Sequence, residues 1–463
     1  MNAKWLPISA AVFMALSSAS AFAADNNGWE VHGYGKLGGQ WDGSGANAMG
    51  DFGKSSYRTM TSADENNNQV ELQVKKRMQV KGKVWGDFVT RMEYGNVRAC
   101  SGAGDNTVCQ SYFNSSSSSE HDPSDEGNFE VKEAYVEMGG FDFLGSDTSI
   151  WAGQRFTNRS QGLLSKEFWK QSSGVGAGVK VGAGGFDIVS ADPGEGLGGK
   201  DGNVIVIPGS DQVDYTTMTS FNAYYYGVQG GPLGGSFDFD LKYIKRAHKD
   251  DSTATPDANA EDGVGGAITY NRNYYGFKGW SQTGIGYGTG LAANRGVNFG
   301  HWSSGFGKDS KSLFATSYGV AEVTKDFQLG SEVTYWAPEH VWGNVDVERF
   351  IIGFQPSYKI NDNLRAILTG SYATEKVQDQ AGNPGWGFAE DTFTYYSAEA
   401  ALAFSVDSDY FGRPQIKPYV AYVTGDGKGT WTGAKSDHYA AERMGVSGSD
   451  DQTFFGVEAE VWF

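Results

Sequence analysis

The chain contains 463 residues, of which 66 are glycine and 14% are aromatic, and its formal net charge is -18. It has no basic tract, so nucleic acid is not expected as a partner. After the first two dozen residues, no stretch approaches the ~18 consecutive apolar residues of a transmembrane helix, so a membrane role would have to be carried by strands.

The first residues have the features of an export signal. Lys4 supplies a positive end, residues 6–16 are mostly apolar, and Ala21-Phe22-Ala23 is a small-x-small cleavage site. The apolar stretch is shorter than the ~20 residues of a spanning helix, which argues against a retained membrane anchor. We therefore expect residues 1–23 to be a signal peptide and residues 24–463 to form a single mature domain.

Residues 29–41 show the first clear period of two. The odd positions are apolar or glycine, and the even positions are mostly polar. Such alternation is typical of a strand that separates lipid from water. The string from Gly33 to Gly38 also fits the dinucleotide pattern GxGxxG, but no helical segment follows it. We therefore interpret these glycines as strand residues that ease curvature and packing.

The same alternation recurs further along the chain, at residues 69–74, 84–93, 350–355 and 364–371. Short polar turns join some of these strands, whereas the connection over residues 99–127 is long. Short turns on one side and long loops on the other are typical of outer-membrane barrels. At about 24 residues per strand and connection, the mature chain provides roughly 18 strands and an aqueous lumen, although this count does not separate 16 from 18.

The last nine residues form the clearest predicted strand. From residue 455 to 463 the odd positions are apolar, and the even positions include Glu458, Glu460 and Trp462. A terminal aromatic, Phe463, on the lipid face fits the interfacial girdle of such barrels. Because strands satisfy their backbone groups in lipid only when the sheet closes, the sequence predicts an all-β, antiparallel transmembrane barrel of a bacterial outer membrane.

The chain has two cysteines, Cys100 and Cys109. An exported protein meets an oxidising compartment, so a disulfide that closes this small loop is expected. A metal pair is the alternative, but no His-rich spacing accompanies the cysteines, and we expect neither a metal nor a cofactor. The sequence also has no HExxH, GxSxG, CxxC or P-loop string, so an enzyme is not expected.

Aromatic residues on polar faces are the most informative feature for function. Tyr34 shares a face with His32 and Lys36, and Trp462 shares one with Glu458 and Glu460. Sugars stack their C–H faces on aromatic rings and hydrogen-bond to charged groups through their hydroxyls. The alternative is that these rings belong to the interfacial girdles, and alternation alone does not separate the two.

The sequence resembles the maltoporin family of trimeric, 18-stranded, sugar-specific porins. The resemblance runs in order along nearly the whole mature chain, and WAGxRF is its most specific string. Its anchors are His32-Gly33-Tyr34, Ser55-Ser56-Tyr57-Arg58, SIWAGQRF at 149–156, GVGAG at 174–178, Gly412-Arg413-Pro414 and EVWF at 460–463. The resemblance implies a homotrimer in outer-membrane lipid that passes oligosaccharides.

The resemblance also implies roles for particular residues. A line of lumen aromatics would stack on sugar, namely Tyr34, Trp280, Phe411 and Trp462. A charged track would bond the sugar hydroxyls, namely Lys36, Arg58, Glu71, Lys132 and Arg159. Alternation supports Lys36 and Glu71 as lumen residues and leaves Lys132 ambiguous. It places Phe411 toward the lumen if its register is unbroken, and Trp280 is expected in or near a turn. For part of the charged list, plain lumen lining is the alternative.

Several positions depart from the family pattern. In the family, the loop after SIWAGQRF folds inward and a tyrosine there narrows the pore, whereas here the spacing gives Phe168, with Lys166 in place of an acidic residue. Gln69 stands where the family has another tyrosine of the aromatic line. The cysteine pair falls in the second outer loop rather than the first. Gln69 and Phe168 support an alternative function, a general or ion-selective porin without sugar preference.

Overall fold

The computed structural model describes residues 28–42, 45–48, 59–62, 69–79, 83–95, 100–101, 108–109, 128–166, 168–191, 204–206, 213–231, 234–248, 260–299, 306–341, 345–379, 390–429 and 451–463. Within these ranges the chain is almost entirely β-strand, with two short 3-10 helices. Among the described residues, no helix combines the length and the apolar character needed to cross a membrane.

The strands follow the alternating segments of the sequence. Their bounds are β1 (Trp29–Asp42), β2 (Gly45–Ala48), β3 (Gln69–Gln79), β4 (Trp85–Gly95), β5 (Cys100–Ser101), β6 (Val108–Cys109), β7 (Asn128–Gly139), β8 (Thr148–Gln161), β9 (Phe168–Val181), β10 (Gly184–Ala191), β11 (Val204–Val206), β12 (Val213–Gln229), β13 (Ser236–His248), β14 (Asp262–Arg272), β15 (Gly279–Thr289), β16 (Phe306–Glu322), β17 (Phe327–Val341), β18 (Val345–Asn361), β19 (Leu364–Asp379), β20 (Glu390–Ser405), β21 (Gln415–Gly429) and β22 (Asp451–Trp462). The 3-10 helices are η3 (Tyr274–Gly276) and η4 (Gly290–Ala292).

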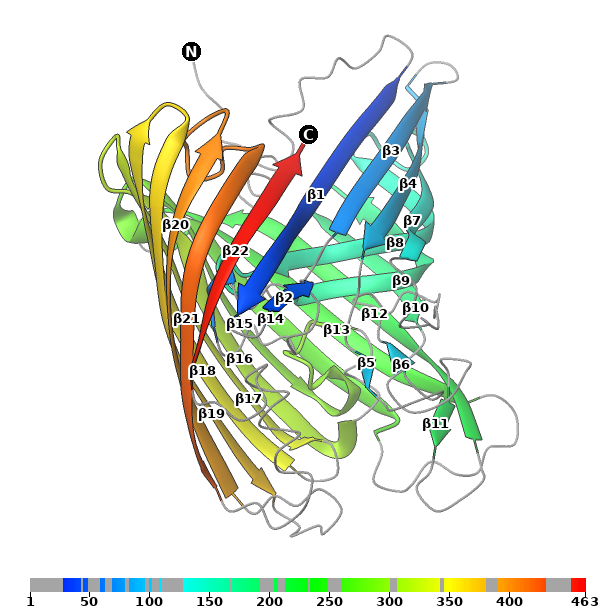
Figure 1. Cartoon of the computed structure of the whole chain (residues 1–463). Helices are drawn as coiled ribbons and strands as arrows, with labels where there is room; N and C mark the ends of the chain where they lie inside the picture. Colours follow the sequence, from blue (N-terminus) through cyan, green and yellow to red (C-terminus); the bar gives the residue numbers. More distant parts are fainter. Residues whose placement is uncertain are drawn as a thin grey trace.

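One closed antiparallel barrel accounts for 18 of these strands (Figure 1). The main sheet contains 20 strands, of which β2 and β11 are short additions, and the others pair with their neighbours in chain order. Closure comes from β1, which pairs with β3 on one side and with β22 on the other. A closed sheet leaves no unpaired strand edge in lipid. The predicted barrel is confirmed, with 18 strands rather than 16.

The last residue takes part in this closure. The Gly33 N–H donates to the Phe463 carbonyl at 2.8 Å, and the Phe463 N–H donates to the Gly33 carbonyl at 3.0 Å. A Cβ atom on Gly33 would lie 2.3 Å from Cζ of the Phe463 ring. The glycine string in β1 therefore serves packing, as the sequence predicts, and is not a nucleotide loop.

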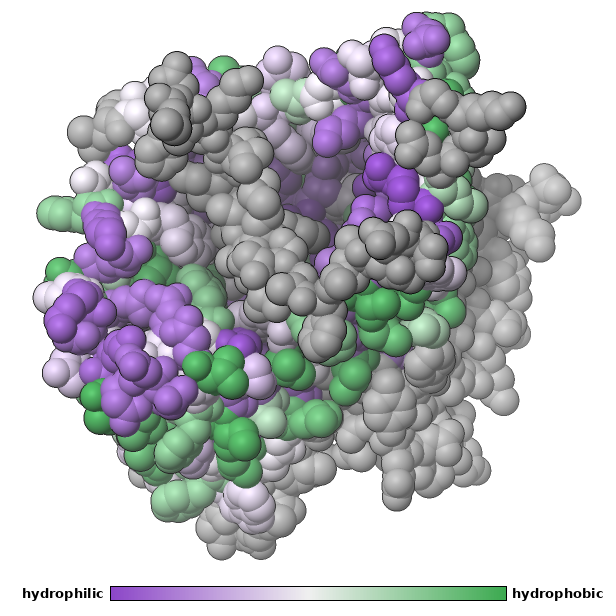
Figure 2. Space-filling view, turned by 90° about the horizontal axis from the view of Figure 1, so that it is seen from above, coloured by the Kyte–Doolittle hydropathy of each residue, from purple (hydrophilic) through white to green (hydrophobic). Residues whose placement is uncertain are grey.

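The two faces of the barrel follow the alternation of each strand. Large apolar side chains such as Trp29, Leu37 and Phe455 are exposed on the outside, whereas Lys36 and Glu458 are buried inside. Seen from above, hydrophilic residues surround a hollow in the molecule (Figure 2). Short connections such as residues 182–183 lie at the end where β1 begins and β22 ends. Short turns of outer-membrane barrels face the periplasm, so this is the periplasmic end.

Three segments between strands fold into the barrel, namely residues 59–62, 162–166 and 290–299. Leu164 packs in one buried cluster with Met60, Ile351 and Tyr395, although β18 and β20 lie across the barrel from β8 in the strand order. The segment 290–299 is also buried, and its Asn298 pairs with Gln171 of β9. The expected inward-folded loop after residues 149–156 is therefore confirmed.

Candidate functional site

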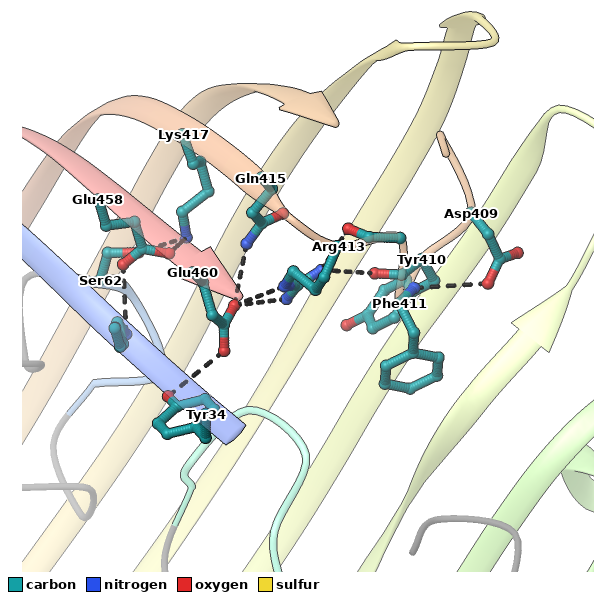
Figure 3. A network of polar contacts seen from close by, with 12 residues as sticks. Tyr34, Ser62, Asp409, Tyr410, Phe411, Arg413, Gln415, Lys417, Glu458 and Glu460 are labelled. Carbon is teal, nitrogen blue, oxygen red and sulfur yellow. Dashed lines mark hydrogen bonds and ion pairs between the residues drawn. The ribbon is translucent and has the colours of Figure 1, made fainter. Parts of the chain in front are cut away.

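A network of polar contacts lines the wall formed by β1, β22 and the start of β21 (Figure 3). The Glu460 carboxylate is at its centre: Arg413 Nη2 lies 2.6 Å from Oε2, and Gln415 Nε2 donates to the same oxygen at 3.0 Å. The Tyr34 hydroxyl donates to Oε1 at 3.4 Å. A tyrosine, a guanidinium and a carboxylate thus meet within one stretch of the lumen wall.

A second group of charges continues along the same wall. Glu458 pairs with Lys36 at 3.2 Å and with Lys417 at 2.8 Å, and the Lys417 ammonium also donates to the Ser62 hydroxyl at 2.7 Å. The Ser62 N–H in turn donates to the Glu399 carboxylate at 2.5 Å. These contacts hold the inward segment 59–62 against β20 and β21. Lys36 is therefore on the lumen side, as the alternation predicts.

The aromatic line has its most accessible pair near the periplasmic end. The rings of Trp280 and Phe411 are 6.3 Å apart with an interplanar angle of 33°, and both side chains are half-buried. Trp280 is the second residue of β15, next to η3, as the sequence predicts. Phe411 lies in the turn before β21, which begins only at Gln415, so its strand register is broken. The turn, rather than strand alternation, brings its ring to Trp280.

The other two aromatic residues face each other across β1 and β22. Tyr34 and Trp462 are register partners, and Tyr34 is half-buried. Trp462 is only 8% exposed, and the Arg413 guanidinium carbon lies 4.4 Å from the centre of its ring. One face of Trp462 is therefore occupied by Arg413. The line thus consists of a more open pair, Trp280 and Phe411, and a more enclosed pair.

Tyr410 precedes Phe411 in the same turn and is buried. Its hydroxyl donates to Gln355 Oε1 at 2.5 Å, and its ring meets that of Phe411 edge-on at 5.0 Å between centres. Burial raises the pKa of the Tyr410 hydroxyl above its ordinary value, so this group remains a neutral donor. These contacts fix the backbone of the turn that carries Phe411.

The remaining charged residues lie on β3, β4, β7 and β8. Glu71 pairs with Arg91 at 2.9 Å, and Arg91 also pairs with Glu133 at 2.7 Å. Lys132 is 1% exposed and is the extra residue of a bulge, because Arg91 faces Glu133 while the next residue, Met92, faces Val131. The bulge explains why simple alternation was ambiguous at Lys132.

The constriction predicted around Phe168 has an extensive set of contacts. The Arg159 guanidinium carbon lies 4.0 Å from the centre of the Phe168 ring. The Phe168 carbonyl accepts hydrogen bonds from Arg295 Nη1 at 2.7 Å and from Asn298 Nδ2 at 2.9 Å. Arg159 and Phe168 are thus brought together, although one was assigned to the charged track and the other to the constriction.

Some predicted residues are only partly placed. Arg58 lies outside the described residues. Gln69 pairs with Lys36 in the backbone register of β1 and β3. Cys100 and Cys109 are directly opposite each other in the register of β5 and β6. Within the described part of the chain, no group of three or more His, Cys, Asp or Glu side chains is arranged to hold a metal ion.

The sequence predicts no functional role for four residues of these networks, namely Arg91, Glu332, Arg413 and Glu460. Arg91 and Glu460 lie on polar faces of predicted strands, and Arg413 lies in the Gly412-Arg413-Pro414 string. Nothing in the sequence indicates which residues they contact. No motif or alternation in the sequence points to Glu332. Its carboxylate contacts residues 164 and 165, which are far away in the chain.

A closed barrel with an apolar exterior and a polar lumen narrowed by inward loops defines a porin of the bacterial outer membrane. The model of the LamB porin family matches residues 29–463. The chain therefore belongs to the LamB porin family, as the resemblance to maltoporins implied. It is an outer-membrane channel and not an enzyme.

Individual relatives are distant in sequence. The maltoporin of Vibrio cholerae serotype O1 is 21% identical over 98% of both chains. The maltoporin of Hahella chejuensis is 24% identical over 73% of this chain and 74% of its own. Among solved structures, OccK10 (OpdN) of Pseudomonas aeruginosa is 9% identical, with a TM-score of 0.45 over 94% of this chain and 99% of its own.

Proposed function

We propose that this channel is selective for sugars and passes oligosaccharides by diffusion along Tyr34, Trp280, Phe411 and Trp462. The observation that carries the proposal is the half-buried pair of Trp280 and Phe411, whose rings are 6.3 Å apart. Phe411 shares its turn with Arg413, which pairs with Glu460. Relatives named maltoporin support the same substrate class.

In this mechanism the rings and the charges have separate tasks. The aromatic faces stack on the C–H faces of a sugar, while flanking charges exchange hydrogen bonds with its hydroxyls. The flanking residues would be Lys36, Arg58, Glu71, Lys132 and Arg159, together with Arg413 and Glu460. Phe168 would form an apolar wall of the constriction. Several weak sites in a row lower the barrier to entry without preventing exit.

Conductance in planar bilayers tests the proposal. Ion current is recorded while maltodextrins, sucrose or β-glucosides are titrated. A saturable block by one of these sugars is the expected result. An open channel that none of them blocks would contradict sugar selectivity and favour a general or ion-selective porin. The absence of any conductance would contradict a diffusion channel altogether.

We also propose the processing and assembly of the mature protein. Residues 1–23 are removed on export, and residues 24–463 form one domain that assembles as a homotrimer in outer-membrane lipid. N-terminal sequencing of protein purified from outer membranes should begin near residue 24. Cross-linking in detergent should give a trimeric species, and a monomeric species alone would contradict the assembly.

The cysteine pair is proposed to form a disulfide. The register that places Cys100 opposite Cys109 supports this pairing. Thiol labelling of the denatured, unreduced protein should give no modification, whereas labelling after reduction should modify both cysteines. Labelling before reduction would refute the disulfide.

A further inference from the structure

The constriction loop 162–166 is hydrogen-bonded to a carboxylate from another part of the barrel. Glu332 of β17 is 2% exposed, and its Oε2 accepts hydrogen bonds from the Leu164 N–H at 2.6 Å and from the Ser165 N–H at 3.1 Å. The Ser165 hydroxyl donates to the other oxygen, Oε1. Glu332 therefore contacts two consecutive residues of the loop from across the lumen.

These bonds leave the loop little freedom. Three hydrogen bonds from the loop converge on this one carboxyl group, and a buried site strengthens each of them. Leu164 is also packed against Met60 and Ile351. A Cβ atom on Gly162 would lie 2.4 Å from Glu332 Oε1, so the close approach of loop and carboxylate leaves no room for a side chain at residue 162.

The held segment leads directly to the constriction. Phe168 follows Ser165 by three residues, and its carbonyl accepts hydrogen bonds from Arg295 and Asn298 of the inward segment 290–299. The chain from 164 to 168 is therefore fixed near both ends, by β17 and by the inward segment 290–299. Loss of the Glu332 carboxylate would remove the hydrogen bonds at one end and leave those at the other in place.

We propose that Glu332 is a positioning residue that sets the aperture of the pore by fixing the constriction loop. Its effect on ion conductance does not require a sugar. Its effect on sugar block rests on the proposed function, because a displaced loop would also move Phe168 relative to the aromatic line. The two readouts therefore separate this inference from sugar selectivity.

The decisive comparison is between E332A and E332Q in planar bilayers. E332A removes the acceptor for both N–H groups, so the loop should move away from β17. Conductance depends on the narrowest cross-section, and we expect a rise of roughly twofold with increased current noise. In E332Q the amide oxygen still accepts both N–H groups, and its NH₂ group donates to the Ser165 hydroxyl. Conductance should therefore stay near that of the wild type.

Asp238 provides a matched control on the barrel wall. It is also a buried carboxylate that accepts a backbone N–H, at 2.8 Å from Gly227, and among the described residues its hydrogen bonds are with Gly227 and Asn271 rather than with the loop. D238A should therefore leave conductance unchanged. If E332A does not fold, E332D carries the same test, because it withdraws the carboxylate by one methylene group.

The outcomes separate position from charge. A rise in E332A (or E332D) with wild-type values in E332Q and D238A supports the proposal. Equal rises in E332A and E332Q would show an effect of lumen charge and overturn it, as would an unchanged E332A or a similar rise in D238A. If a sugar blocks the wild type while E332A keeps wild-type conductance, only this inference fails. If no sugar blocks any variant, the conductance comparison still stands.

Discussion

Arg413 makes the rings of the aromatic line unequally accessible. Its guanidinium covers one face of Trp462 and pairs with Glu460, so Trp462 is 8% exposed. Trp280 and Phe411 have no such cover in the contacts of the described residues, and both are half-buried. A sugar that stacks on the line therefore meets its freest ring surface at Phe411 and Trp280, rather than at the penultimate residue of the chain.

This difference predicts unequal effects of alanine substitution. Loss of one stacked ring costs roughly 1 kcal/mol, or about fivefold in the constant for sugar block. F411A and W280A should each show this loss, and W462A should show less. The measurement is current block by the sugar that blocks the wild type. F455A, which removes an exposed ring from the lipid face, is the control and should not change the block. A larger loss in W462A than in F411A would contradict the view that Arg413 makes Trp462 less accessible to sugar.

At the scale of the strand, alternation predicts which face each residue occupies only while the register is regular. It is correct over residues 29–41, where Trp29 and Leu37 face lipid and Lys36 faces the lumen. It cannot place Lys132, because a bulge in β7 shifts the parity there. It also fails to explain Phe411, because a turn rather than a strand carries that residue. Alternation contains no information about which loop reaches Glu332.

The bulge in β7 has a specific stabilising contact. Gln154 of β8 donates through Nε2 to the carbonyls of Val131 and Lys132, both at 3.1 Å. Gln154 is the register partner of Val175, whose side chain is exposed on the lipid face. The two carbonyls freed by the bulge would otherwise face lipid without a donor, which is costly.

Replacing this amide should therefore destabilise the barrel. Q154L keeps the size of the side chain but removes both hydrogen bonds, and we expect a loss of about 1–3 kcal/mol in the free energy of unfolding. Urea unfolding in lipid vesicles, followed by tryptophan fluorescence, measures this change. A152L adds an apolar group to the same face of β8 and should be nearly neutral. Equal stability of Q154L and the wild type would show that the hydrogen bonds of Gln154 to the bulge are dispensable.

At the scale of the whole molecule, the barrel depends on the contact between its first and last strands. The Phe463 ring occupies the space that a side chain at Gly33 would need. G33V should displace the ring and cost roughly 1–2 kcal/mol, as is typical of overpacking. The fraction that refolds into detergent, measured by heat-modifiable electrophoresis, should fall.

The double variant G33V/F463A tests the cause of this loss. Removal of the ring frees the space, so G33V should cost less in an F463A background than in the wild type. F463A alone gives the reference for the lost ring. If G33V is equally harmful in both backgrounds, the clash with Phe463 is not the reason for its effect.

The double hydrogen bond between Gly33 and Phe463 also fixes the order of events in biogenesis. The strand that completes the cylinder, β22, begins at Asp451, and it must meet β1, which lies far before it in the sequence. Until then, β1 and β21 each present an unsatisfied edge that lipid cannot tolerate. The barrel can therefore close only after β22 has been synthesised and exported. The unfinished polypeptide has to be kept apart from other chains in the periplasm, where exposed strand edges would promote aggregation.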